Sequence, residues 1–208
     1  MKGKVVVIAA PSGAGKTSLV KALVESSANI DVAVSHTTRA KRPGEIDGVN
    51  YHFTSKDAFL TLQSADGFIE SAEVFGNLYG TSREAMDKIV QQGKHLLLEI
   101  DYQGAAQIRA KVPDAISIFI LPPSLATLKK RLHSRAQDDA ATIERRTSEA
   151  MNEISHCREF DYLVINDDFD TALGQIRAII ETLAPEFSIE QQLQRQASLL
   201  SELLTTST

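Results

Sequence analysis

The residues best suited to chemistry lie in the stretch APSGAGKTS at positions 10–18, directly after the apolar run VVVIA. Gly13 and Gly15 permit a tight turn in which several backbone N–H groups point into one concavity, a geometry suited to a polyphosphate. Lys16 can reach the β- and γ-phosphates, and the Thr17 hydroxyl can bind Mg²⁺. A helix that begins here adds the positive end of its dipole. The spacing therefore predicts a nucleotide-phosphate site.

The general phosphate-loop pattern has glycine at the position that Ala10 occupies in this chain. That glycine serves the turn from strand to loop more than it serves phosphate contact, so a methyl group is tolerated there. A glycine-rich turn with an incidental lysine is the competing interpretation. The preceding apolar run and the following helical pattern speak against it, because a phosphate-binding loop joins a buried strand to a helix.

The strands and helices that position this loop can be predicted, because apolar runs alternate with segments of helical periodicity along the chain. The expected strands are residues 4–9, 95–100, 116–121 and 162–165. The expected helices are residues 17–26, 102–111, 124–134, 142–157 and 171–183. Continuous Val/Ile/Leu strands separated by helices predict an α/β fold, with a phosphate-loop parallel sheet as the core and helices on both faces.

Two stretches interrupt this pattern and suggest how the chain is organised. Residues 36–84 are polar and glycine-rich, with only short alternating segments such as 68–74, and predict an inserted subdomain. Residues 135–141 carry no apolar anchor and predict a mobile loop within a lid at about 135–146. The predicted division is one domain over 1–184, with its core at 1–35 and 85–184, followed by a helical tail at 185–208.

The amino-acid composition limits which cellular compartments and which classes of partner are expected. The formal net charge of −5 argues against general affinity for nucleic acid or membrane surfaces, which favour basic proteins. The one cysteine, Cys157, cannot form an internal disulfide, which suits a reducing compartment. No signal peptide or membrane-spanning run is evident. A cytoplasmic protein is expected.

A second motif, TTRAKRPGEIDGVNYHF, occupies residues 37–53 inside the expected insert. Arg39 and Arg42 can form bidentate forks on a phosphate, and the Tyr51 hydroxyl can donate a further bond. A solvated basic loop would be the better interpretation of an isolated R-x-x-R. Here the whole stretch resembles the guanylate kinase signature T-[ST]-R-x-x-[KR]-x-x-[DE]-x-x-G-x-x-Y-x-F. The resemblance extends over residues 3–184.

The resemblance implies the reaction ATP + GMP = ADP + GDP, with a GMP-binding insert and a mobile lid. The implied GMP-binding residues are Ser35, Arg39, Arg42, Glu45, Tyr51, Glu70, Tyr79, Thr81 and Asp101. The implied ATP-binding residues are Pro11, Ser12, Gly13, Ala14, Gly15, Lys16, Thr17, Ser18, Arg131, Arg135 and Asn166. The implied catalytic residues are Lys16, Arg42, Arg135 and Arg146. Mg²⁺, bound with ATP, would be held by Thr17.

The chemistry of these residue types agrees with the implied roles. Guanine presents donors at N1 and at its exocyclic amine, so the carboxylate of Glu70 is a natural acceptor, while the Ser35 hydroxyl can donate to O6. Phosphoryl transfer needs positive charge around the spreading oxygens and exclusion of water, which arginines on mobile segments supply. No general base is required, because the GMP phosphate is already an anionic nucleophile.

Two other functions remain open. A guanylate-kinase-like module that binds a protein partner would be expected to lose the cations of the phosphate loop and lid, but this chain keeps Lys16, Thr17, Arg135 and Arg146. A kinase acting on a sugar phosphate would not need Glu70 beside the basic motif. Comparing GMP, AMP, UMP and ribose phosphates at fixed ATP separates these possibilities.

The tail after residue 184 carries leucines and other apolar residues at helical spacing. It either packs on its own domain or mediates self-association. Leu199 and Leu203 widen the apolar stripe beyond what a peripheral helix needs, which favours a homo-oligomer assembled through this tail.

Overall fold

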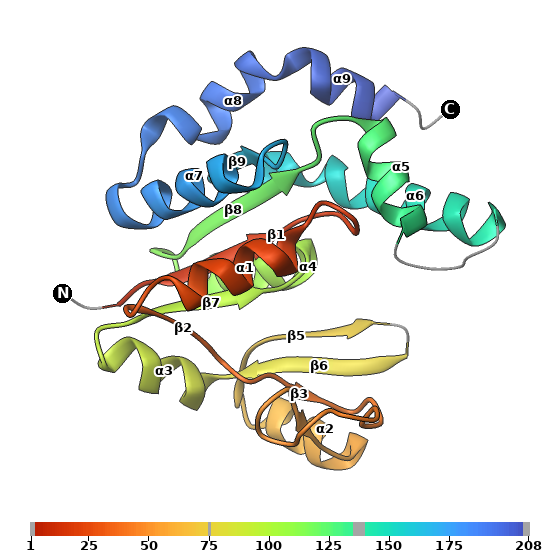
Figure 1. Ribbon diagram of the computed structural model, residues 1–208. Helices are drawn as coiled ribbons and strands as arrows, with labels where there is room; N and C mark the ends of the chain where they lie inside the picture. Colours follow the sequence, from red (N-terminus) through yellow and green to blue (C-terminus); the bar gives the residue numbers. More distant parts are fainter. Residues whose placement is uncertain (1–2, 75, 135–139, 206–208) are drawn as a thin grey trace. The chain divides into compact units, whose positions relative to one another are not determined.

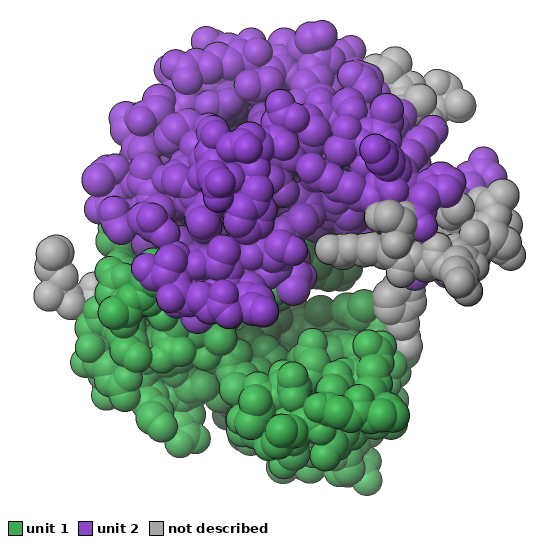
Figure 2. Space-filling model, in the orientation of Figure 1, with its two compact units in different colours: residues 1–7, 27–115 green, residues 8–26, 116–208 purple. Residues whose placement is uncertain are grey.

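The computed structural model describes residues 3–74, 76–134 and 140–205 and shows a mixed α/β chain (Figure 1). It divides into two compact units (Figure 2). Unit 1 comprises Met1–Val7 and Ser27–Ala115, and unit 2 comprises Ile8–Ser26 and Ile116–Thr208. The boundary crosses strand β1 (Val5–Ala9), which belongs to both units. The two units are described separately below.

A sheet with the strand order β2-β7-β1-β8-β9 forms the core. Its other strands are β2 (Ile30–Val32), β7 (His95–Glu99), β8 (Ile116–Leu121) and β9 (Tyr162–Ile165). The pairs β2–β7 and β8–β9 are parallel. Every residue of β1 and β8 is buried, as expected of continuous apolar strands between helical layers. The predicted parallel sheet flanked by helices is confirmed, and the short strand β2 is an addition to it.

Unit 1 contains a second, four-stranded sheet with the order β4-β3-β6-β5. These strands are β3 (His36–Thr37), β4 (His52–Phe53), β5 (Phe68–Val74) and β6 (Asn77–Ser82). Helices α2 (Lys56–Ser64), α3 (Arg83–Gln91) and α4 (Tyr102–Lys111) complete the unit. Residues 36–84 thus contain more regular structure than the short segments expected from the sequence.

The helices α2 and α3 were not expected from the sequence, because the stretch 36–84 as a whole is polar and glycine-rich. Serine side chains begin both of them. The Ser55 hydroxyl accepts a hydrogen bond from the Ala58 N–H, and the Ser82 hydroxyl accepts one from the Ala85 N–H. These are N-caps, which satisfy backbone donors that a helix start leaves free. A capping serine therefore marks the start of each of these helices.

Unit 2 surrounds β8 and β9 with helices. These are α1 (Lys16–Glu25), α5 (Leu125–Ser134), α6 (Ala140–Ser155) and α7 (Phe169–Thr182). The α6 helix begins at residue 140, so the last two residues of the expected loop 135–141 are helical. Residues 135–139 of the predicted lid lie outside the described residues.

The tail folds into a 3₁₀ turn (Pro185–Phe187), α8 (Ile189–Arg195) and α9 (Ala197–Thr205). Leu203 is fully buried and Leu200 is 3% exposed. The Leu125 N–H donates to the Glu202 carboxylate at 3.2 Å, which ties α9 to the start of α5. The tail therefore packs on its own unit, where the side chain of Leu203 is already buried. Within the described part of the chain, no helix is long and apolar enough to cross a membrane.

Candidate active site

The phosphate loop of unit 2 has the turn that its glycines predict. Gly13 and Gly15 have φ angles of 87° and 92°, in the left-handed region that favours glycine. The Ala14 N–H donates to the Pro11 carbonyl at 3.1 Å, which closes the turn, and Gly15 is the N-cap of α1. Lys16 and Thr17 are thereby placed in the first turn of a helix. This arrangement can receive an anionic phosphate group.

Two side chains from elsewhere in unit 2 hold the loop. The amide of Asn166, only 5% exposed, donates to the Ala14 carbonyl at 2.6 Å. Arg131 donates to the same carbonyl at 3.4 Å and to the Asn166 carbonyl at 3.2 Å. A Cβ on Gly15 would lie 2.5 Å from the Asn166 amide nitrogen, so this contact also requires glycine. Asn166 and Arg131 therefore shape the loop.

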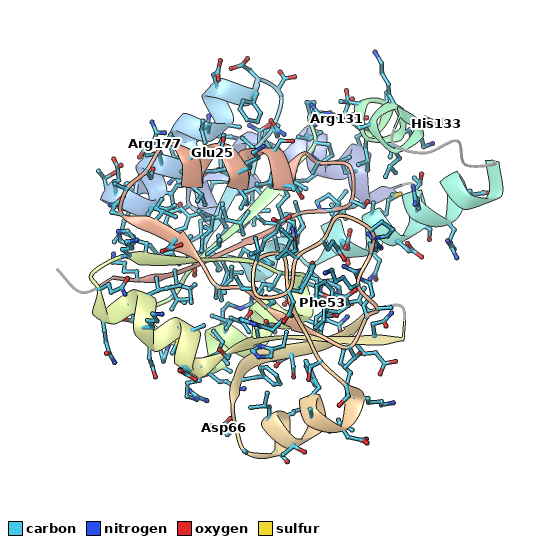
Figure 3. The ribbon with its side chains drawn as sticks, turned by 60° about the horizontal axis from the view of Figure 1, so that its bottom comes forward. Glu25, Phe53, Asp66, Arg131, His133 and Arg177 are labelled. Carbon is cyan, nitrogen blue, oxygen red and sulfur yellow. The ribbon has the colours of Figure 1, made fainter. Side chains whose placement is uncertain are left out.

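A cavity of about 280 Å³ opens beside this loop. It is lined by Gly13, Gly15, Ser18, Arg131, Asn166, Asp167 and Phe169. Phe169, at the start of α7, is 39% exposed and offers an aromatic ring to the cavity. Arg131 stands on α5 (Figure 3). The cavity combines backbone donors, a cation and a ring, which suits a nucleotide, and the sequence did not single out Phe169.

Glu153 is a further contact that the sequence did not indicate. Its carboxylate accepts a hydrogen bond from the Ser12 N–H of the phosphate loop at 3.0 Å. Arg146 lies on the same helix, α6, seven positions earlier. Because seven residues are about two helical turns, Arg146 and Glu153 share one face of α6. Arg135 lies outside the described residues.

The basic motif of unit 1 forms a compact cluster of charged and aromatic side chains. Arg39 makes a two-point contact with Glu45, with N–O distances of 3.1 Å and 2.7 Å. The Glu45 carboxylate also accepts from the Arg42 N–H at 2.7 Å. The Arg39 guanidinium lies over the ring of Tyr51, 5.4 Å from its centroid, and the Tyr51 and Tyr79 rings are 5.9 Å apart. Five of the nine residues implied for GMP thus form one connected cluster.

The Glu45 carboxylate is hydrogen bonded to both arginines of the motif. Hydrogen bonds from the Arg39 side chain and the Arg42 backbone lower the pKa of the Glu45 carboxyl, so the carboxylate is the stable form. A carboxylate cannot accept from a phosphate that is itself an acceptor. Glu45 is therefore placed to orient Arg39, whereas Arg42 has an exposed side chain. The Arg39 guanidinium also lies over the ring of Phe53 in β4, 5.7 Å from its centroid.

The second group of unit 1 residues gathers at the start of β5. Glu70 pairs with Thr81 across β5 and β6, and the two are 4% and 1% exposed. The Ser35 hydroxyl lies 3.3 Å from the Thr81 hydroxyl. The Asp101 carboxylate caps α4 by accepting from the Gly104 N–H at 2.8 Å. Positions far apart in the chain thus form one polar group within unit 1.

Glu70 is a buried carboxyl, and its environment is consistent with a binding role. Burial raises its pKa, and the nearby Asp101 raises it further, whereas hydrogen bonds from Thr81 and the charge of Lys111 oppose the rise. A buried ionisable group that is only partly compensated is a common mark of a functional site. A ligand with two adjacent N–H donors would satisfy the carboxylate.

The fold and the two groups of residues define a phosphate-loop nucleotide-binding protein. A family model described as guanylate kinase matches residues 2–183. The chain is 53% identical to a guanylate kinase of Alcanivorax borkumensis over 203 residues, covering 98% of this chain and 97% of that protein. It is 50% identical to one of Nitrosococcus oceani, covering 98% of this chain and all of that protein.

Structure comparison agrees with the sequence comparisons. The crystal structure of guanylate kinase from Anaplasma phagocytophilum aligns with a TM-score of 0.71 and 34% identity, covering 93% of this chain and 95% of that one. The chain belongs to the guanylate kinase family.

Proposed function

We propose that this protein transfers the γ-phosphoryl group of ATP to GMP, giving ADP and GDP. The observation that carries the proposal is the buried Glu70 carboxylate, held by Thr81 beside Ser35 and Asp101 in the unit that also carries the Arg39 cluster. Guanine is the purine base of GMP whose Watson–Crick edge offers two adjacent donors. Family membership supports the same reaction.

The residues of unit 1 would bind GMP. Glu70 would accept from guanine N1–H and the exocyclic amine, and Ser35 would donate to O6. Arg39, Arg42, Tyr51 and Tyr79 would bind the phosphate, with Glu45 orienting Arg39. Thr81 and Asp101 would support the base-reading carboxylate and hydroxyl.

The residues of unit 2 would bind ATP. The phosphate loop at 10–18 would hold the β- and γ-phosphates, and the cavity beside Asn166 and Phe169 would take the adenosine. Lys16, Arg42, Arg135 and Arg146 would stabilise charge on the transferring group. Because the GMP phosphate and the γ-phosphate must meet, the reaction requires the two sets of residues to converge when both substrates are bound.

Mg²⁺ fits this proposal through the chemistry of the loop. Thr17 supplies a hard hydroxyl oxygen in the first turn of α1, next to Lys16. Mg²⁺ in proteins is held by few side chains, with the remaining positions filled by water and substrate phosphates. When bound, the ion would neutralise charge on the β- and γ-phosphates. The cytoplasmic location predicted from the sequence stays a prediction.

A substrate panel tests the proposal. ADP formation is measured at fixed ATP and Mg²⁺ with GMP, AMP, UMP and ribose 5-phosphate as acceptors. We expect GMP to be preferred over AMP by roughly 10⁴ in kcat/KM, because AMP leaves the buried carboxylate facing an acceptor. Absence of ADP formation with every acceptor would favour the non-catalytic binding module. Preference for ribose 5-phosphate would favour the sugar-phosphate kinase.

A further inference from the structure

The strand that carries Glu70 is an edge strand with an irregular register. In the sheet order β4-β3-β6-β5, the described strands leave β5 with a neighbour on the β6 side only. The pairing of β5 with β6 shifts between Phe68 and Glu70, which marks a β-bulge. Bulges and open edges loosen the backbone ladder, and bulges re-aim side chains next to functional sites. The orientation of Glu70 therefore needs support from the open side of β5.

A single side chain from α4 supplies that support. The Gln107 amide oxygen accepts from the Ser71 N–H at 3.1 Å, and its amide nitrogen donates to the Ser71 carbonyl at 2.7 Å. Both bonds are made to the backbone of the residue that follows Glu70. A primary amide has one donor face and one acceptor face, so Gln107 reproduces the pair of bonds that a neighbouring strand would make.

The same helix approaches Glu70 directly. A Cβ on Gly104 would lie 3.2 Å from the Glu70 carboxylate oxygen Oε2, so α4 approaches the carboxylate closely and a side chain at position 104 would crowd it. Asp101 begins α4 and caps it. Gln107 therefore joins the Glu70 segment to the helix that presents Asp101, and ties two base-reading positions to one rigid element.

We propose that Gln107 is a positioning residue for guanine recognition, acting through the Ser71 peptide on the Glu70 carboxylate. This inference rests on the proposed function for its kinetic consequence, but not for its structural one. Loss of the two bonds loosens the peptide groups on both sides of Ser71 at an open sheet edge. The carboxylate of Glu70 then samples orientations in which it no longer meets two adjacent donors.

The test compares Gln107→Met, which keeps the side-chain length and removes both hydrogen bonds, with the parent. The variant Gln107→Glu keeps the size but turns a carboxylate oxygen toward the Ser71 carbonyl, so it should behave in the same way. The control is Gln91→Met, an exposed glutamine at the end of α3 in the same unit. Steady-state kinetics are measured with ATP and either GMP or IMP, the analogue that lacks the exocyclic amine.

Gln107→Met should raise the KM for GMP about tenfold and leave the KM for ATP within twofold of the parent. The preference for GMP over IMP should fall several-fold, because one of the two donors read by Glu70 is what separates these bases. The control should match the parent in every value. An unchanged KM for GMP, or equal losses with GMP and IMP, would overturn the proposal, since a purely structural defect lowers both alike.

A second readout separates this inference from the proposed function. Hydrogen exchange of the Ser71 amide is followed in the substrate-free protein, where Gln107→Met should exchange at least tenfold faster than the parent and Gln91→Met should not. If the parent fails to phosphorylate GMP, the proposed reaction is wrong. The exchange measurement still tests the role of Gln107, because it does not depend on catalysis. Equal exchange rates in the parent and Gln107→Met would refute the proposal that Gln107 holds the Ser71 backbone.

Discussion

Replacing Glu70 by glutamine exchanges one carboxylate oxygen for an NH₂ group in the polar group of unit 1 and tests the central assignment. The side chain is 4% exposed and accepts hydrogen bonds from the Thr81 side chain and backbone. Thr81 therefore determines which way the new amide turns: its oxygen takes the bonds from Thr81, and its NH₂ group faces the ligand. The variant presents a donor where guanine also presents a donor.

The magnitude follows from the bonds that are lost. A hydrogen bond to a charged acceptor contributes about 1.5–3 kcal/mol, and a buried donor left without an acceptor costs about 1–3 kcal/mol. Together these contributions amount to about 2.5–6 kcal/mol, which corresponds to a loss of roughly 10²–10⁴ in kcat/KM for GMP. The affinity for ATP should not change, because Glu70 lies in unit 1 and the phosphate loop lies in unit 2.

The pH dependence has a definite sign. Guanine recognition needs the ionised carboxylate, and burial raises the pKa of Glu70 above its ordinary value. The parent should therefore lose kcat/KM for GMP on acidification at a higher pH than an ordinary glutamate would cause, and Glu70→Gln should lack this step. In the substrate-free protein the folded state holds the Glu70 proton more tightly than the unfolded state does. Stability should then fall as the pH rises from the ordinary glutamate range through the raised pKa, and Glu70→Gln should remove that loss.

Coupled assays of ADP formation across a pH series, with thermal melts of the same samples, measure all three effects. Glu73→Gln, on the exposed part of β5, is the matched control and should resemble the parent. A Glu70→Gln protein that phosphorylates GMP as well as the parent would refute the assignment of Glu70 as the guanine reader. A variant that also lost ATP affinity would indicate a general folding defect.

Three further predictions concern unit 2. Arg146→Ala should lower kcat by ~10³ or more with little change in the KM for GMP, and a loss confined to GMP affinity would instead assign Arg146 to substrate binding. Asn166→Ala removes the 2.6 Å bond to the Ala14 carbonyl and should raise the KM for ATP about tenfold with the KM for GMP unchanged; an unchanged KM for ATP would contradict a role in shaping the loop. A chain ending at Ala184 should melt at a lower temperature, because Leu203 is fully buried, and if the tail mediates assembly it should also have fewer subunits by light scattering. An equal subunit count would refute assembly through the tail.

Contiguous signals in the sequence identified the family and the fold class. The phosphate loop lies within nine consecutive residues, 10–18, and its turn follows from the glycines themselves. The motif at 37–53 likewise spans one short stretch in which Arg39 and Glu45 are six positions apart. Apolar runs long enough to be buried on both faces predicted the parallel sheet. Such features depend on neighbours in the chain, so a sequence displays them directly.

Other parts of the site depend on contacts between distant positions. Asn166 meets the carbonyl of Ala14 across 152 positions, and Gln107 meets Ser71 across 36. The first residue was expected to face adenine and the second was not singled out, because an amide in a sequence does not reveal which backbone group it will bond. The helices α2 and α3 were missed because the glycine-rich stretch around them was interpreted as an irregular insert, although a capping serine begins each of them.

The sequence alone therefore determined the phosphate loop, the basic motif and the parallel strands, and it singled out the carboxylate that we propose reads guanine. Only the tertiary structure decided how that carboxylate is held: burial raises its pKa, Thr81 orients it from β6, and α4 supports its strand from the open edge. The physical reason is that a side chain's chemistry belongs to its residue type. Its orientation, desolvation and partners are set by segments that folding brings together from far along the chain.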